Sequence, residues 1–345
     1  MEIEGAHIVS AAGLLGGLAL GLAARLGRFC MMASIEDAVY GADNSGVRVL
    51  TLGAATAIAA TTLLIALGGL DADAPRYLRD EWSPLASILG GLIFGYGMAQ
   101  VGTCGYGTLV RLGGGDLRSL VLAAVIGVTA YAVALGPLAP VTALMFHPGI
   151  SVAPVPALPE LIGTPIGFSP ALISFVIAAL LAVSALAGGA LPRRRVVGAI
   201  VVGLSIAGAW AATSYAATVG MDAVSVSSFS FVMPLGGTIL SSMTGDPLAL
   251  PGFGVSAVIG VVLGASIGAN LREEIRWEAC DDARELRRQI AGAVMMGVGG
   301  VLAVGCTVGQ GLSALSVLSV SAPITIAAMA AGARLGLFAL VERTA

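Results

Sequence analysis

The chain has 345 residues, of which 57% are hydrophobic and only 11% are charged, and its formal net charge is −3. Soluble globular proteins carry about 25% charged residues, so this composition excludes an ordinary soluble domain, and the few charges give no indication of nucleic-acid binding. Several apolar blocks are about 20 residues long, the length of an α-helix that crosses the hydrocarbon core of a bilayer. The blocks do not alternate apolar and polar residues as the strands of a membrane barrel do. The sequence therefore predicts an all-α polytopic membrane protein.

We expect about nine transmembrane helices, taken here in chain order. They cover roughly residues 8–27, 47–70, 84–103, 117–140, 168–190, 196–214, 252–271, 290–305 and 315–340. The segments between some of them are weakly polar and rich in Gly, Ser and Pro, and they comprise residues 28–46, 141–167 and 215–250. We expect short or re-entrant elements there, because backbone that is not helical survives at membrane depth only where protein or water surrounds it.

The arginines predict the orientation. The sequence contains no lysine, and if the nine spans alternate, 15 of the 17 basic residues fall on one face. Only Arg76 and Arg79 fall on the other face. The face that is rich in arginine is cytoplasmic by the positive-inside rule. We therefore expect the N-terminus outside and the C-terminus in the cytoplasm.

One sequence pattern occurs twice around a cysteine. LIFGYGMAQVGTCGYGTLV, around Cys104, and AVMMGVGGVLAVGCTVGQGLSALS, around Cys306, share three glycines and the cysteine at one constant offset. We interpret the chain as one integral membrane domain, residues 1–345, with a first repeat half at about 8–140, a connecting region at 141–251 and a second half at about 252–340. The span order makes the two cysteine-bearing helices antiparallel, as an inverted repeat requires.

A second pattern also recurs at a fixed offset, and it conflicts with that symmetry. Small residues at every fourth position let helices approach closely, and the matching set is Gly13, Gly17, Gly21 and Arg25 with Gly260, Gly264, Gly268 and Arg272. The span order makes these two helices parallel, which a simple inverted repeat forbids. Either one of the ambiguous segments is re-entrant or one of the two matches is fortuitous.

The cysteines lie in stretches so dense in glycine that a continuous helix is disfavoured. We expect each helix to break near its cysteine, which frees backbone N–H groups at membrane depth. The N-terminus of the following helix adds a partial positive charge, so each break suits a small anion. The residues that we expect to line this site are Cys104, Gly105, Gly107, Gly305, Cys306, Thr307, Gly309 and Gln310.

A thiol is a weak hydrogen-bond donor, soft and polarizable, and it suits an anion with exposed sulfur or selenium. Free cysteines are also commonly buried as small hydrophobic residues, and that alternative stays open for each of them. Cys30 follows the first span in GRFCMMASIEDAVYG, close to Arg28, Glu36 and Asp37. Cys280 lies in the most charged stretch, where we expect a solvated interfacial helix, and we exclude it from the site.

Several stretches resemble the YeeE/YedE family of membrane proteins, namely GRFCMMASIEDAVYG, the paired glycine–cysteine motifs and RWEACDDARELRRQIAGAVMMGVGGVLAVGCTVGQGLSALS. The resemblance implies a pseudo-symmetric, hourglass-like fold in a bacterial inner membrane and uptake of thiosulfate or a related sulfur or selenium species. Cys104 and Cys306 would pass the anion along by hydrogen bonding, with Cys30 toward the cytoplasmic exit. It also implies a small cytoplasmic sulfur-carrier protein, similar to sulfurtransferases, as a partner.

The sequence therefore predicts a transporter or channel for an inorganic sulfur anion, and neither an enzyme nor a cofactor-binding protein. A metal site is not expected, because the sequence has no CxxC motif and only two histidines, His7 and His147. Two alternatives stay open. A membrane thiol oxidoreductase or sulfurtransferase would form a cysteine persulfide and would need a thiolate, whereas a purely structural membrane protein would need none of the thiols.

Overall fold

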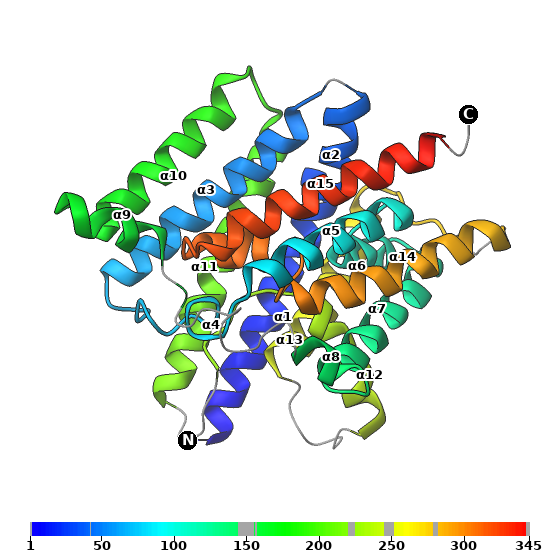
Figure 1. Ribbon diagram of the computed structural model, residues 1–345, viewed down its shortest axis with the longest axis horizontal. Coiled ribbons are helices and arrows are strands. Elements are labelled where there is room, and N and C mark those ends of the chain that lie inside the picture. The colour runs from blue at the N-terminus through cyan, green and yellow to red at the C-terminus, as the bar shows by residue number, and fades with distance from the viewer. Residues whose placement is uncertain are drawn as a thin grey trace.

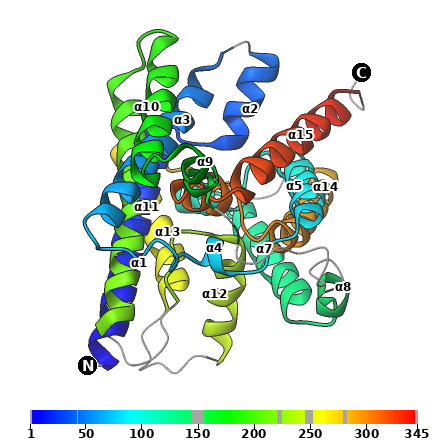
Figure 2. The same ribbon diagram turned by 60° about the vertical axis from the view of Figure 1, so that its left-hand side comes forward.

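The computed structural model describes residues 2–41, 43–143, 155, 157–219, 225–244, 252–278 and 282–342. The protein is 78% helical, without a strand in the described residues, and the helices form one bundle (Figures 1 and 2). The helices are α1 (Glu2–Gly27), α2 (Met31–Tyr40), α3 (Ser45–Ala66), α4 (Arg76–Arg79), α5 (Pro84–Val101), α6 (Gly105–Gly113), α7 (Arg118–Ala134), α8 (Ala139–Ala143), α9 (Leu158–Ile166), α10 (Pro170–Ala187), α11 (Arg193–Val219), α12 (Val232–Thr244), α13 (Phe253–Leu271), α14 (Ala283–Leu302), the π-helix Gly309–Ala314 and α15 (Ser321–Glu342). Cys280 and His147 lie outside the described residues.

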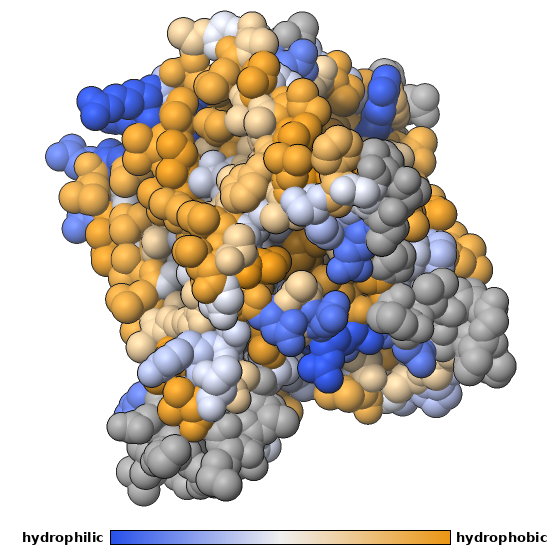
Figure 3. Space-filling model, turned by 90° about the vertical axis from the view of Figure 1, so that its left-hand side faces the viewer, coloured by the Kyte–Doolittle hydropathy of each residue, from blue (hydrophilic) through white to orange (hydrophobic). Residues whose placement is uncertain are grey.

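The prediction of an all-α polytopic membrane fold is confirmed. Seven helices in the described part of the chain are long and apolar enough to cross a membrane, and the face drawn in Figure 3 is largely hydrophobic. Each of the nine predicted ranges contains a helix. The two that fall short of a full apolar span are α7, which has 17 residues, and α14, whose first turns carry charged side chains.

The glycine stripes of α1 and α13 pack against each other. A Cβ at Gly17 would lie 2.4 Å from the Ala257 carbonyl oxygen, and one at Gly264 would lie 2.1 Å from that of Leu18. Contacts advance in the same direction along both helices, so α1 and α13 are parallel, as the span order predicts. Close helix packing accounts for this repeated pattern, because small residues on both faces bring the two backbones together.

The helices that lead to Cys104 and Cys306, α5 and α14, pack side by side in antiparallel directions. A Cβ added to Gly97 would lie 2.6 Å from the Gly292 carbonyl oxygen. A Cβ added to Gly299 would likewise lie 2.6 Å from the Gly90 carbonyl oxygen. We call α5, α6 and α7 the first cysteine unit, and α14, the π-helix and α15 the second. The last helix of each unit contacts the first helix of the other unit, since α15 packs on α5 and α7 packs on α14. This reciprocal packing is the arrangement that an inverted repeat produces, whereas the limits of the two repeat halves stay a prediction.

The segment 225–231, which precedes α12, is extended rather than helical, and it passes through the protein interior. Phe229 and Phe231 are both fully buried. The hydroxyl of Ser313 on the π-helix donates to the Phe229 carbonyl at 2.7 Å, so the segment is fixed against the chain that follows Cys306. Non-helical backbone is thus enclosed by protein, as a membrane location requires.

Candidate functional site

Cys306 lies at the break between α14 and the π-helix, and its side chain is fully buried. Its Sγ accepts hydrogen bonds from the backbone N–H groups of Phe231 and Gly309, both at 3.4 Å, and lies 3.9 Å from the Ser230 hydroxyl. The helix breaks because Val304 has a φ of 53° and Gly305 a φ of 156°, the second of which favours glycine. The two N–H groups occupy the acceptor side of the thiol and leave its S–H available as a donor.

Gln310 stabilises this break. Its Nε2 donates to the Ala303 carbonyl at 2.9 Å and to that of Val304 at 3.3 Å. These carbonyls belong to the end of α14, where the helix has no further backbone donors. The amide of Gln310 therefore caps the broken helix and holds the loop that carries Cys306.

Cys104 occupies the equivalent break after α5, where it is the N-cap residue of α6. Its Sγ accepts from the backbone N–H of Gly107 at 3.4 Å. A Cβ at Gly107 would lie only 2.1 Å from Thr103 Oγ1, whereas one at Gly105 would meet nothing within 4 Å. Gly107 is thus required by local packing, and Gly105 borders open space.

A cavity of about 300 Å³ joins Cys104 to Thr307. We call it the inner cavity, because the positive-inside rule predicts that its end of the helices faces the cytoplasm. Its wall is largely apolar, and it includes Phe29 and Met31 on either side of Cys30, which is itself only partly buried. The hydroxyl of Thr307 is buried. The Thr307 side chain interacts with the neighbouring Cys104 thiol, so the two residues supply this cavity with a buried hydroxyl beside a thiol.

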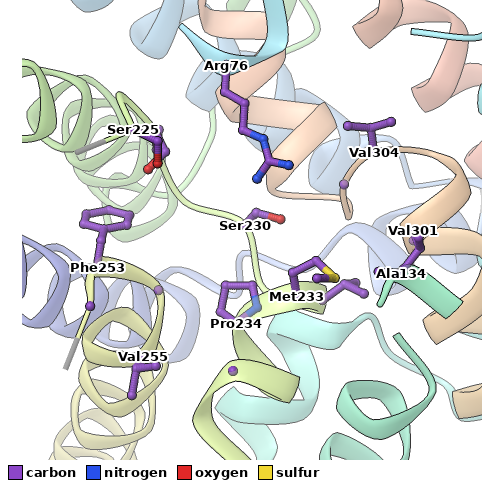
Figure 4. Close-up of a pocket in the computed structure, with 18 of the residues that line it drawn as sticks. Arg76, Ala134, Ser225, Ser230, Met233, Pro234, Phe253, Val255, Val301 and Val304 are labelled. Atoms are coloured by element: carbon purple, nitrogen blue, oxygen red, sulfur yellow. The ribbon is translucent and has the colours of Figure 1, made fainter. Parts of the chain in front are cut away.

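A second, outer cavity of about 460 Å³ lies beyond Cys306. The extended segment supplies Ser225, Ser227, Ser228 and Ser230 to its wall, and Figure 4 shows the Arg76 side chain reaching into it toward Ser230. Arg76 also pairs with Asp80. The outer cavity is therefore the more polar of the two, and it carries a cationic side chain that attracts anions.

The two cavities lie toward opposite ends of the parallel pair α1 and α13. The outer one is lined by residues 252–255, at the start of α13, and the inner one by Phe29 and Met31, just beyond the end of α1. Gly305 borders the outer cavity and Thr307 the inner one. Cys306 lies between these two residues in the chain, and its buried side chain is not part of either cavity wall.

Family comparison agrees with this geometry. Residues 26–335 match the model of the family described as sulphur transport. The chain belongs to this family. The match spans all three cysteines of the predicted site, and together with the multi-pass helical fold it indicates a transporter that moves a sulfur species across a membrane. Comparison with curated proteins found no match.

Sequence reasoning missed three groups around Cys306: the Ser230 hydroxyl, the Phe231 N–H and the side chain of Tyr77. A Cβ built on Gly309 would lie 2.9 Å from both the Ser230 and Tyr77 hydroxyls. Burial raises the pKa of Tyr77 above its ordinary value, so its phenol stays a proton donor at neutral pH. The run SVSSFSF held the signal for Ser230, since four hydroxyls in an apolar chain are unusual, but nothing in the sequence linked it to Cys306.

Proposed function

We propose that this protein takes up thiosulfate, or a closely related inorganic sulfur anion, through a path that runs from the outer cavity past Cys306 and Cys104 to the inner cavity. The observation that carries the proposal is the position of Cys306. This buried thiol lies in the chain between Gly305, which borders the outer cavity, and Thr307, which borders the inner one, and the two cavities lie toward opposite ends of membrane-spanning helices. Two buried thiols in series suit an anion that presents a soft sulfur atom.

The residues act in order along this path. Arg76 attracts the anion into the outer cavity. The S–H of Cys306 donates to it, while the N–H groups of Phe231 and Gly309 hold the sulfur of the thiol in place. Cys104 and the buried hydroxyl of Thr307 receive the anion on the inner side. The segment of Cys30 borders the exit from the inner cavity.

The positive-inside rule supports a bacterial inner membrane location with the inner cavity facing the cytoplasm. We propose that the N-terminus is outside, the C-terminus is cytoplasmic, and a small sulfur-carrier protein receives the anion there. In this proposal the protein transports its substrate without covalent chemistry, because each step needs only neutral thiols and hydrogen bonds.

The test is uptake of radiolabelled thiosulfate into proteoliposomes by the wild type, Cys306→Ala and Cys306→Ser, with excess unlabelled sulfate present. We expect uptake that resists sulfate, falls at least about tenfold in the alanine variant, and is partly retained by serine, which keeps a donor. Absence of uptake by folded wild type would refute partner-free thiosulfate transport. Release of sulfite by the wild type, together with complete loss of sulfur uptake and of sulfite release in the serine variant, would instead indicate sulfur transfer from thiosulfate to a Cys306 persulfide.

A further inference from the structure

The inner neck of the outer cavity is bordered by two hydroxyls and one thiol. The hydroxyls of Tyr77 and Ser230 converge on Gly309, where each would lie 2.9 Å from an added Cβ. Ser230 Oγ is also 3.9 Å from Cys306 Sγ. The two hydroxyls also interact with each other, so the one that accepts in this pair keeps its hydrogen for an anion. Two hydroxyl oxygens and one sulfur atom therefore lie close together beside the outer cavity, to which Tyr77 and Ser230 contribute.

The inner side has a thiol where the outer side has a hydroxyl. Cys30 directly precedes α2, which packs on α3 and α15, and Ser230 lies just before α12, which packs on α13 and α7. Under the reciprocal packing of the two cysteine units, α12 takes the place of α2, so Ser230 stands near the position of Cys30. We call the group of Tyr77, Ser230 and Cys306 the outer station, and it combines oxygen and sulfur donors. The inner counterpart, Cys30 and Cys104, has two thiols.

The two kinds of donor suit different ends of one anion. Hydroxyl groups make short, strong hydrogen bonds to negatively charged oxygen atoms, and a thiol is a weak donor that suits a large, polarizable acceptor. Arg76 adds positive charge from the wall of the same cavity. An anion with a sulfonate-type group at one end and a bare sulfur at the other end matches both sides of this station.

We propose that Tyr77 and Ser230 determine specificity by binding the oxygen-bearing end of the anion while Cys306 binds its terminal sulfur. The outer station then selects thio-oxyanions over anions that carry only oxygen or only a soft atom. This inference rests on the proposed transport function.

The experiment measures the KM for thiosulfate in proteoliposomes for the wild type, Tyr77→Phe and Ser230→Ala. Tyr215→Phe and Ser242→Ala are matched controls, because both side chains are exposed and line neither cavity. Tyr77→Phe retains the edge contact with Trp210, whose ring centroid is 6.4 Å away. We expect the KM to rise about tenfold in each test variant, the effect of losing a hydrogen bond to a charged group, and by less than about twofold in the controls.

Competition by thiocyanate, a soft anion without oxygen, tests which end the hydroxyls bind. In the wild type unlabelled thiosulfate should compete at least about tenfold better than thiocyanate, and this preference should shrink about tenfold in Tyr77→Phe and Ser230→Ala. An unchanged KM and an unchanged preference in both variants would overturn the inference, as would an equal rise in the controls. Absence of thiosulfate uptake by the wild type would refute the proposed function instead, so the two failures are distinguishable.

Discussion

Replacing Gly309 by alanine tests the transport path with a single methyl group. Gly309 starts the π-helix and has no left-handed φ, so its backbone accepts alanine. The new Cβ would lie 2.9 Å from the hydroxyls of Ser230 and Tyr77. Both hydroxyls are ends of side chains rather than backbone, and each must move by about 0.5 Å to reach an ordinary contact of 3.4 Å. The fold should tolerate this change, and removing a glycine from a helix favours folding by about 0.5–1 kcal/mol.

The cost to the anion is much larger. The methyl group would lie between the two hydroxyls and narrow the space that they share, so an anion oxygen that accepts from them would be pushed beyond hydrogen-bonding distance. A hydrogen bond to a charged group contributes about 1.5–3 kcal/mol, so loss of both corresponds to about 3–6 kcal/mol. At a factor of ten for each 1.4 kcal/mol, the KM for thiosulfate should rise at least about 100-fold.

The control is Gly208→Ala on α11, because a Cβ at Gly208 would meet nothing within 4 Å and Gly208 lines neither cavity. The assay is thiosulfate uptake by proteoliposomes, together with thermal unfolding in detergent for both variants. We expect both proteins to unfold near the wild-type temperature and only Gly309→Ala to lose uptake. Wild-type uptake by Gly309→Ala, or the same loss in both variants, would refute this placement of the path.

Two further predictions concern the packing that positions the path. Gly95→Ala places a Cβ 2.0 Å from the Met329 carbonyl of α15. It should destabilise the protein by about 2 kcal/mol, since overpacking costs about 1–3 kcal/mol. Gly208→Ala, with open space around its Cβ, should not lower the unfolding temperature, and equal effects of the two variants would contradict the close α5–α15 contact. Ser313→Ala removes the hydroxyl that donates to the Phe229 carbonyl and should lower the free energy of unfolding by about 1–3 kcal/mol. It should also raise the KM for thiosulfate, because this hydrogen bond holds the segment 225–231 in place. A lowered unfolding temperature with an unchanged KM would show that the hydrogen bond does not position the site.

The sequence by itself determined the class of fold and the place of each membrane helix. Long apolar blocks have only one stable form in a bilayer, because every backbone N–H and C=O must be paired within the segment. Glycine density also indicated the breaks after α5 and α14, since closely spaced glycines disfavour a continuous helix. It also anticipated that α1 and α13 are parallel while α5 and α14 are antiparallel.

Only the tertiary structure decided which groups surround Cys306. Phe231 is 75 residues away from Cys306 in the chain. Its N–H reaches the thiol because the segment that precedes α12 packs against the chain that carries Cys306 and Ser313. No local pattern encodes such a contact, since its energy comes from long-range packing rather than from the propensity of either segment. Tyr77 is a second example. It lies in the short helix α4, far from Gly309 in the chain, and only the packing of the fold brings its hydroxyl to Gly309. The local glycine pattern thus determined where the helices end near the two cysteines. Packing between segments that are distant in the chain determined which groups surround those cysteines.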